Sequence, residues 1–182
     1  MSDEKKNPLM YLFGKTWQYS EGNRKNIVLY WLMFIIAECS NMFCLPLLWA
    51  KIVEVVTKEG ITPDNIKTLY WLLGAALFQV VFVWSLHGPA RTMECGNAFK
   101  ARIDYRRFLL RGILTLPLAW HNEHHSGDTI DRLGKGANAL YNFSEDTFEI
   151  IYSFVRLIAS FCMLLYFSRS AIYTVIPMIC IS

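Results

Sequence analysis

Residues 116–133 read LPLAWHNEHHSGDTIDRL, and they lie at the centre of a polar segment, residues 91–140, that separates two strongly apolar runs. The segment carries eight basic side chains, which makes it too polar to lie in the hydrocarbon of a bilayer. Pro117 has no N–H with which to continue a helix, so a helix that approaches it ends there. The chain is therefore expected to turn within this stretch, and the flanking runs decide what it connects.

Three runs are long and apolar enough to cross a membrane. Residues 68–90 contain no Lys, Arg, Asp or Glu. Two further runs hold one charge each, Glu38 in residues 27–50 and Arg156 in residues 150–168. About 20 helical residues span the ~30 Å hydrocarbon core of a bilayer. Since a soluble domain of 182 residues has too small a core to hide three such helices, the sequence predicts an all-α, polytopic membrane protein.

The predicted elements form one membrane domain over residues 1–182. In chain order they are an amphipathic helix at 7–19, a first span at 26–53, a second helix at 65–116, a turn with a short helix at 118–127, a third helix at 128–168 and the start of a fourth at 171–182. At a rise of about 1.5 Å per residue, residues 68–116 of the second helix are roughly 74 Å long and residues 129–167 of the third are roughly 58 Å long. Both exceed the membrane thickness, so we expect them to extend into the cytoplasm as a helical hairpin. The amphipathic helix either lies on the membrane face or is a frayed tail.

Basic residues are concentrated on one side of the predicted membrane. Residues 1–26 carry five Lys or Arg and residues 91–138 carry eight, whereas the loop at 51–67 balances three basic with three acidic residues. Because basic loops stay on the cytoplasmic side, we expect a multi-pass plasma-membrane protein with a cytoplasmic N-terminus. Glu94 and Asp104 interrupt the basic run beside a span, so contact with lipid phosphates explains it better than nucleic-acid binding.

The centre of the quoted stretch is rich in residue types that bind metals. However, the spacing of His121, Glu123, His124 and His125 matches neither H-E-x-x-H nor a structural zinc pattern, so a docking or solvated tip is expected. The Gly-Lys pair at 134–135 lacks the spacing of a phosphate-binding loop. We therefore expect no catalytic, metal or cofactor-binding residue here, and no ATP hydrolysis by this chain alone.

The quoted stretch also resembles a known family. A basic helix leading to LPLxW at 116–120, a His-rich tip and then SGDxxxRL at 126–133 is similar to the first intracellular loop of type I ABC exporters. The resemblance implies an elbow helix, two transmembrane helices that extend into the cytoplasm, and between them a coupling helix that docks on an ATP-binding domain. It assigns to the coupling helix Trp120, His121, Asn122, Glu123, His124, His125 and Ser126. Many members have an Asp where this chain has Gly136, so the resemblance does not extend to a polar contact made by that Asp.

The resemblance implies that the chain is the transmembrane, substrate-pathway part of an ATP-driven exporter. Its implied partners are the bilayer, a nucleotide-binding domain, a second transmembrane domain in a homo- or heterodimer, and a small-molecule or peptide substrate. ATP and Mg²⁺ would act through the nucleotide-binding domain. Two alternatives stay open: a stand-alone small membrane protein that binds or modulates a partner, and an inactive truncated transporter.

Two ionisable residues lie deep in the predicted spans. Glu38 is 12 positions from Asn26 and Arg156 is 12 positions from Ser168, which places each about 18 Å deep, measured from opposite faces of the membrane. An ion pair between them would reduce the cost of burying both charges. They are candidates for the translocation pathway, and a purely structural ion pair is the alternative.

Overall fold

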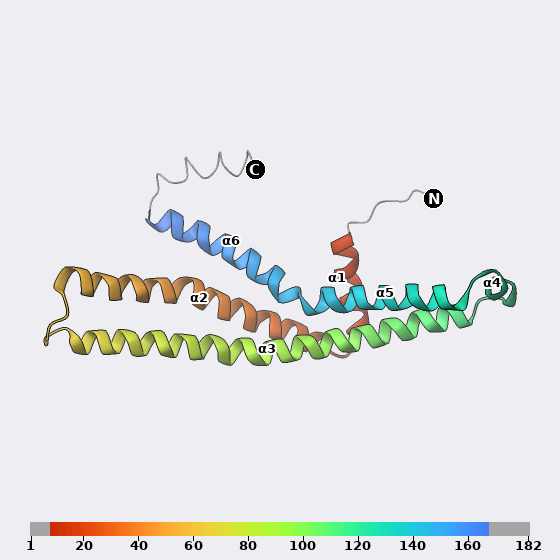
Figure 1. Cartoon of the computed structure of the whole chain (residues 1–182), viewed down its shortest axis with the longest axis horizontal. Coiled ribbons are helices and arrows are strands. Elements are labelled where there is room, and N and C mark those ends of the chain that lie inside the picture. The colour runs from red at the N-terminus through yellow and green to blue at the C-terminus, as the bar shows by residue number, and fades with distance from the viewer. Residues whose placement is uncertain (1–7, 168–182) are drawn as a thin grey trace. The chain divides into compact units, whose positions relative to one another are not determined.

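The structure is a computed structural model that describes residues 8–167 (Figure 1). Its helices, in chain order, are α1 (Pro8–Tyr19), α2 (Arg24–Glu59), α3 (Ile66–Leu114), α4 (Leu118–Glu123), α5 (Ser126–Glu145) and α6 (Thr147–Phe167). No strand occurs among the described residues. The expected start of a fourth span, residues 171–182, lies outside them.

Three helical stretches within the described residues are long and apolar enough to cross a membrane. They are Arg24–Lys58, Ile66–Leu114 and Ser126–Leu165. The prediction of an all-α, polytopic membrane fold is thus confirmed. Each stretch contains an apolar segment of 18 residues, of which only 11% is buried in the second stretch and 6% in the third. These faces are therefore surfaces for lipid or for neighbouring helices, because they are too apolar for water.

The chain divides into two units, and each is described by itself. The hairpin unit comprises residues up to 30 and residues 90–148. The span unit comprises residues 31–89 and the residues from 149 onward. The helices α2 and α3 each contribute to both units.

Both arms of the hairpin unit carry buried apolar residues about one helical turn apart. Ala98 and Ala101 on α3 are fully buried, as are Ala137 and Leu140 on α5 apart from about one per cent of their surface. A spacing of three residues places each pair on one face of its helix. The arms are neighbours, since the Arg102 guanidinium of α3 lies 5.6 Å from the centroid of the Tyr141 ring on α5.

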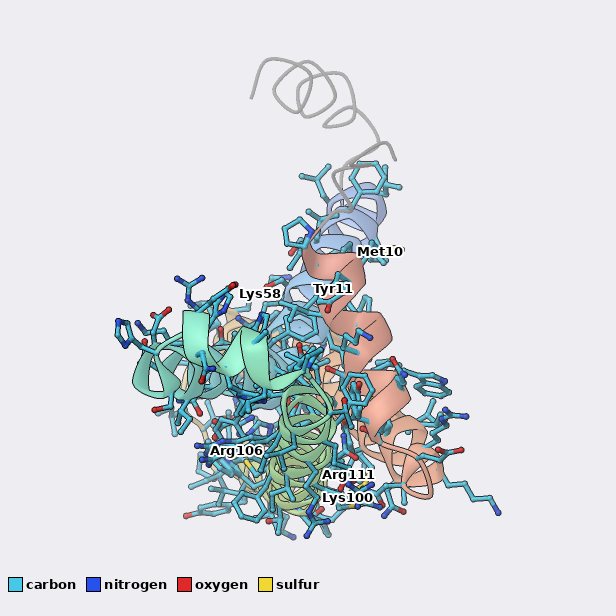
Figure 2. All side chains as sticks on the ribbon, turned by 90° about the vertical axis from the view of Figure 1, so that its right-hand side faces the viewer. Met10, Tyr11, Lys58, Lys100, Arg106 and Arg111 are labelled. Atoms are coloured by element: carbon cyan, nitrogen blue, oxygen red, sulfur yellow. The ribbon has the colours of Figure 1, made fainter. Side chains whose placement is uncertain are left out.

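The helix α1 packs against α5 in the same unit. The rings of Phe13 and Phe143 meet edge to face, with centroids 4.9 Å apart. Beside them, the hydroxyls of Thr16 and Ser144 form a buried hydrogen bond of 2.8 Å. Met10 of the same helix, labelled in Figure 2, is 72% exposed. The segment is therefore a packed amphipathic helix and not a frayed tail.

A buried polar network fixes the chain where α1 ends. Ser20 donates to the carbonyl of Thr16 at 2.6 Å and accepts a bond of 3.0 Å from the amide of Asn97 on α3. The side-chain oxygen of Asn97 in turn accepts a bond of 2.9 Å from the side-chain amide of Asn23. Gly22 has a φ of 82°, a left-handed conformation that favours glycine. Nearby, burial and the neighbouring Tyr11 phenol raise the pKa of Tyr19 above its ordinary value.

The span unit is built from parts of α2, α3 and α6. Phe34 on α2 is fully buried and meets Tyr152 of α6 edge to face, with ring centroids 5.9 Å apart. Gln79 on α3 donates to the hydroxyl of Ser40 on α2 at 2.9 Å. Such polar contacts satisfy side chains that would be costly if left unpaired in an apolar environment.

The third long helix differs from its expected form in one important respect. Instead of a continuous helix over 128–168, the structure has α5 from Ser126 and α6 from Thr147, with Asp146 non-helical between them. The break contains neither Gly nor Pro. Its physical cause is a tertiary contact, because Arg91 and Glu94 of α3 bond to the two helix ends that meet there.

Candidate functional site

The turn between α3 and α5 is formed by the short helix α4 (Figure 1). Pro117 precedes α4 with φ −60° and ψ 152°, an extended conformation that proline adopts readily. The backbone N–H of Trp120 donates to the Pro117 carbonyl at 3.0 Å, and that of His124 closes the helix on the Trp120 carbonyl at 3.1 Å. These bonds hold the turn in a defined shape.

The resemblance implied that residues 120–126 form one helix. The structure divides these residues between α4, a connection and α5. α4 begins earlier, at Leu118, and ends at Glu123. His124 and His125 connect the two helices in extended backbone conformations, and Ser126 begins α5. The helix ends early because the His124 ring and backbone both bond to the Trp120 carbonyl, which closes the last turn.

Trp120 turns inward rather than outward at the tip. Its ring stacks on His124 with centroids 4.2 Å apart and meets His121 edge to face at 5.3 Å. Together with the arms it lines a cavity of about 550 Å³, whose walls comprise Leu109, Ile113, Trp120, His124, Asp128, Thr129, Arg132 and Leu133. Trp120 therefore joins the tip to both arms, while His121, Asn122, Glu123, His125 and Ser126 are exposed.

An exposed apolar residue at the tip was missed by the sequence analysis. Leu118 is the first residue of α4, and 76% of its surface is exposed. Leu114, at the end of α3, is also exposed. Neighbouring exposed leucines at the end of a polar hairpin indicate a contact surface, because burial of each leucine would contribute about 2 kcal/mol. The signal in the sequence was Leu118 itself, an apolar residue directly after Pro117 in a polar segment.

The charges around the tip are mostly solvent-exposed and paired within α5. Arg132 bonds Asp128 at 2.9 Å and Lys135 bonds Asp131 at 2.6 Å, each across one helical turn. Exposed pairs of this kind contribute little to stability. Figure 2 shows further basic side chains, Lys100, Arg106 and Arg111, along the second half of α3. Among the described residues no group of three or more His, Cys, Asp or Glu is placed to hold a metal ion.

Two residues of α3, Arg91 and Glu94, contact the break between α5 and α6. Together with their partners, Glu145 and Phe148, we name them the latch. Arg91 donates to the backbone carbonyl of Glu145, the last residue of α5. Glu94 accepts a bond of 2.9 Å from the backbone N–H of Phe148, in the first turn of α6. Each contact supplies a partner to a helix end that lacks an intrahelical one.

The signs of the latch charges suit the helix ends that they contact. A cation is favourable at the carboxyl end of a helix and an anion at the amino end. Arg91 and Glu94 also form an ion pair of 2.7 Å, and the Arg91 guanidinium lies 4.4 Å from the centroid of the Phe148 ring. Glu94 is fully buried, and this burial raises the pKa of its carboxyl to about 7, so its ionised form depends on Arg91 and the Phe148 N–H for compensation of its charge. The latch thus fixes the break in place.

The two ionisable residues of the spans meet in the span unit. The Arg156 Nε donates to the Glu38 carboxylate at 2.5 Å. The side chain of Glu38 is only 2% exposed, whereas that of Arg156 is 56% exposed. The pair is therefore asymmetric: the carboxylate is enclosed, and the guanidinium faces outward.

This ion pair lies in the wall of a second cavity, of about 260 Å³. We name it the span cavity, and its lining residues are Glu38, Asn41, Val80, Val83, Trp84, His87, Tyr152 and Arg156. His87 Nδ1 and the Tyr152 hydroxyl lie 2.8 Å apart in a hydrogen bond. The sequence analysis did not single out His87 or Tyr152. Their polar side chains inside the apolar runs 68–90 and 150–168 were the signal, because polar side chains inside a span usually face a bundle interior or a wet cavity.

Comparison with known proteins agrees with this architecture. The family model of the ABC transporter transmembrane region matches residues 27–182, which is most of the chain. No curated protein and no solved structure gives a significant match. The matched segment contains the three membrane-capable helical stretches, the tip helix and the span cavity. The chain therefore belongs to the family of ABC transporter transmembrane regions.

Proposed function

We propose that this chain forms part of the substrate pathway of an ATP-driven exporter and couples the motion of a nucleotide-binding domain to transport through α4. The observation that carries the proposal is the tip, where exposed Leu118 lies at the turn of a hairpin in a family member. A partner protein that buries this leucine would remove its apolar surface from water, which favours binding.

The packing of the hairpin unit supports a mechanical role. Trp120 lines one cavity with residues of both arms, and the arms meet where Arg102 of α3 lies over the ring of Tyr141 on α5. Because close-packed interiors deform little, a displacement applied to α4 moves α3 and α5 together. The latch extends this rigidity to the start of α6, because it fixes both ends of the helix break.

The proposal assigns the partners and the orientation of the chain. The nucleotide-binding domain supplies ATP and Mg²⁺, and a second transmembrane domain, identical or different, completes the pathway. The basic residues of the hairpin and of the first 26 residues favour a cytoplasmic location for both, and thus a multi-pass plasma-membrane protein with its N-terminus inside. In this arrangement the span cavity with Glu38 and Arg156 belongs to the translocation pathway of a small molecule or peptide.

A co-purification experiment tests the docking role. The tagged chain is isolated from its native membranes in mild detergent, and ATPase activity in the eluate is measured. We expect Leu118→Glu to remove most of that activity, because a carboxylate would be buried in the docking surface. Ile61→Glu is the matched control, since Ile61 is 70% exposed in the loop between α2 and α3 and lies outside the tip.

Two outcomes would contradict the proposal. If both variants retain the ATPase activity of the wild type, Leu118 does not dock on the nucleotide-binding domain. If the wild type carries no ATPase activity at all, the alternative of a stand-alone membrane protein that modulates a partner is favoured instead.

A further inference from the structure

The span cavity exposes donors more than acceptors of hydrogen bonds. The side chain of Arg156 is 56% exposed, while that of Glu38 is 2% exposed and accepts a bond from the Arg156 Nε. A ligand in the cavity therefore meets the positive partner of the pair first. A cation would be repelled by Arg156 and could not reach Glu38 without breaking the ion pair.

The remainder of the cavity wall is mainly apolar or aromatic. Val80, Val83 and Trp84 contribute one helix face of α3, and His87 and Tyr152, which also line the cavity, form a hydrogen bond with each other. Trp84 lies edge to face against His87, with ring centroids 5.6 Å apart. This wall suits an aliphatic or aromatic body, which would gain from burial against valine and tryptophan.

We propose that the span cavity binds an amphipathic organic anion, with its anionic group on Arg156 and its apolar body against Trp84 and the two valines. The proposal rests on the proposed function and names the substrate class of the same pathway. A charge-assisted bond to guanidinium is roughly twice as strong as a neutral one, so a negative group is preferred over a neutral group of the same shape. Glu38 weakens this preference, since its charge opposes that of the ligand at close range.

Three fluorescent probes with the same aromatic body test the charge preference. The full chain is placed in phosphatidylcholine nanodiscs and titrated with dansylglycine, an anion, with dansylamide, which is neutral, and with dansylcadaverine, a cation. Binding to empty nanodiscs is subtracted. We expect dansylglycine to bind about tenfold more tightly than dansylamide and dansylcadaverine to bind most weakly.

Variants of the ion pair give effects of opposite sign. Arg156→Gln should reduce the affinity for dansylglycine to that for dansylamide, and Arg156→Lys should restore part of the difference. Glu38→Gln should raise the affinity for dansylglycine a few-fold, because it removes the opposing charge. Loss of folding would instead lower all affinities, so a gain in Glu38→Gln separates an electrostatic effect from damage. Trp84→Ala should weaken all three probes alike.

The proposal is overturned if dansylglycine shows no saturable binding, if the three probes bind equally, or if dansylcadaverine binds best. A lower dansylglycine affinity in Glu38→Gln would also overturn it, because the pair would then act as a structural unit. None of these results touches the docking of a nucleotide-binding domain at Leu118, which the co-purified ATPase activity measures independently.

Discussion

Substitution of Glu94 by Gln should loosen the junction between α5 and α6 without unfolding the hairpin. Gln keeps the shape of the side chain and an acceptor for the Phe148 N–H, but it removes the charge that pairs with Arg91 at 2.7 Å. Hydrogen bonds to charged groups contribute roughly 1.5–3 kcal/mol. Arg91 keeps its second acidic partner, Glu145, at 3.5 Å, so the full cost of an orphaned buried charge is not expected. We therefore expect a local loss of about 2 kcal/mol.

Amide hydrogen exchange measures this loss directly at the junction. A decrease of about 2 kcal/mol in the free energy of local opening accelerates exchange about 30-fold, since each 1.4 kcal/mol is about tenfold. Mass spectrometry of the chain in nanodiscs should show this acceleration in peptides that cover residues 145–149. Peptides that cover residues 133–140 should exchange as in the wild type.

The matched control for this experiment is Asp104→Asn. It removes an ion pair on the same helix, but the Arg107–Asp104 pair has a distance of 3.5 Å and is largely exposed. Such a pair contributes less than about 1 kcal/mol, so exchange at residues 145–149 should not change. If Glu94→Gln accelerates exchange there by less than about threefold, the latch does not hold the helix break and the reasoning is wrong.

Two further substitutions test the packing of the hairpin unit. Ala101→Leu should lower the thermal unfolding midpoint by several degrees in circular dichroism, because overpacking a buried contact costs about 1–3 kcal/mol; the exposed Ala119→Leu should leave it unchanged. Thr16→Val should leave the Ser144 hydroxyl without its buried partner and cost about 1 kcal/mol, seen as faster amide exchange in α1, and unchanged exchange there would argue against the anchoring role of this bond.

The sequence was sufficient to predict the features that depend on the length and the charge of the apolar runs. The uncharged residues 68–90 indicated a span by their length, and Pro117 indicated where α3 must turn. Depth arithmetic also placed Glu38 and Arg156 at similar levels, and the structure brings them into contact. Depth alone did not determine that Glu38 is enclosed and Arg156 exposed, because the rotation of each helix about its axis follows from packing.

The features that escaped prediction depend on contacts between distant residues. No residue near Asp146 interrupts a helix by itself, and the break is held by Arg91 and Glu94, more than 50 positions earlier in the chain. The inward turn of Trp120 likewise depends on the two arms that pack beside it. Such arrangements leave no periodic pattern in the sequence, because tertiary contacts override local propensity.

The most direct test of the coupling proposal measures whether ATP changes the accessibility of the span cavity, and whether this change depends on α4. A cysteine is placed in the cavity by Asn41→Cys, with the five native cysteines replaced by Ala, in the transporter assembled with its nucleotide-binding partner. Modification by a water-soluble maleimide is timed with and without ATP and Mg²⁺. We predict that ATP changes the rate several-fold, and that Trp120→Ala abolishes this change while ATP hydrolysis continues. An undiminished ATP effect in Trp120→Ala would contradict coupling through α4.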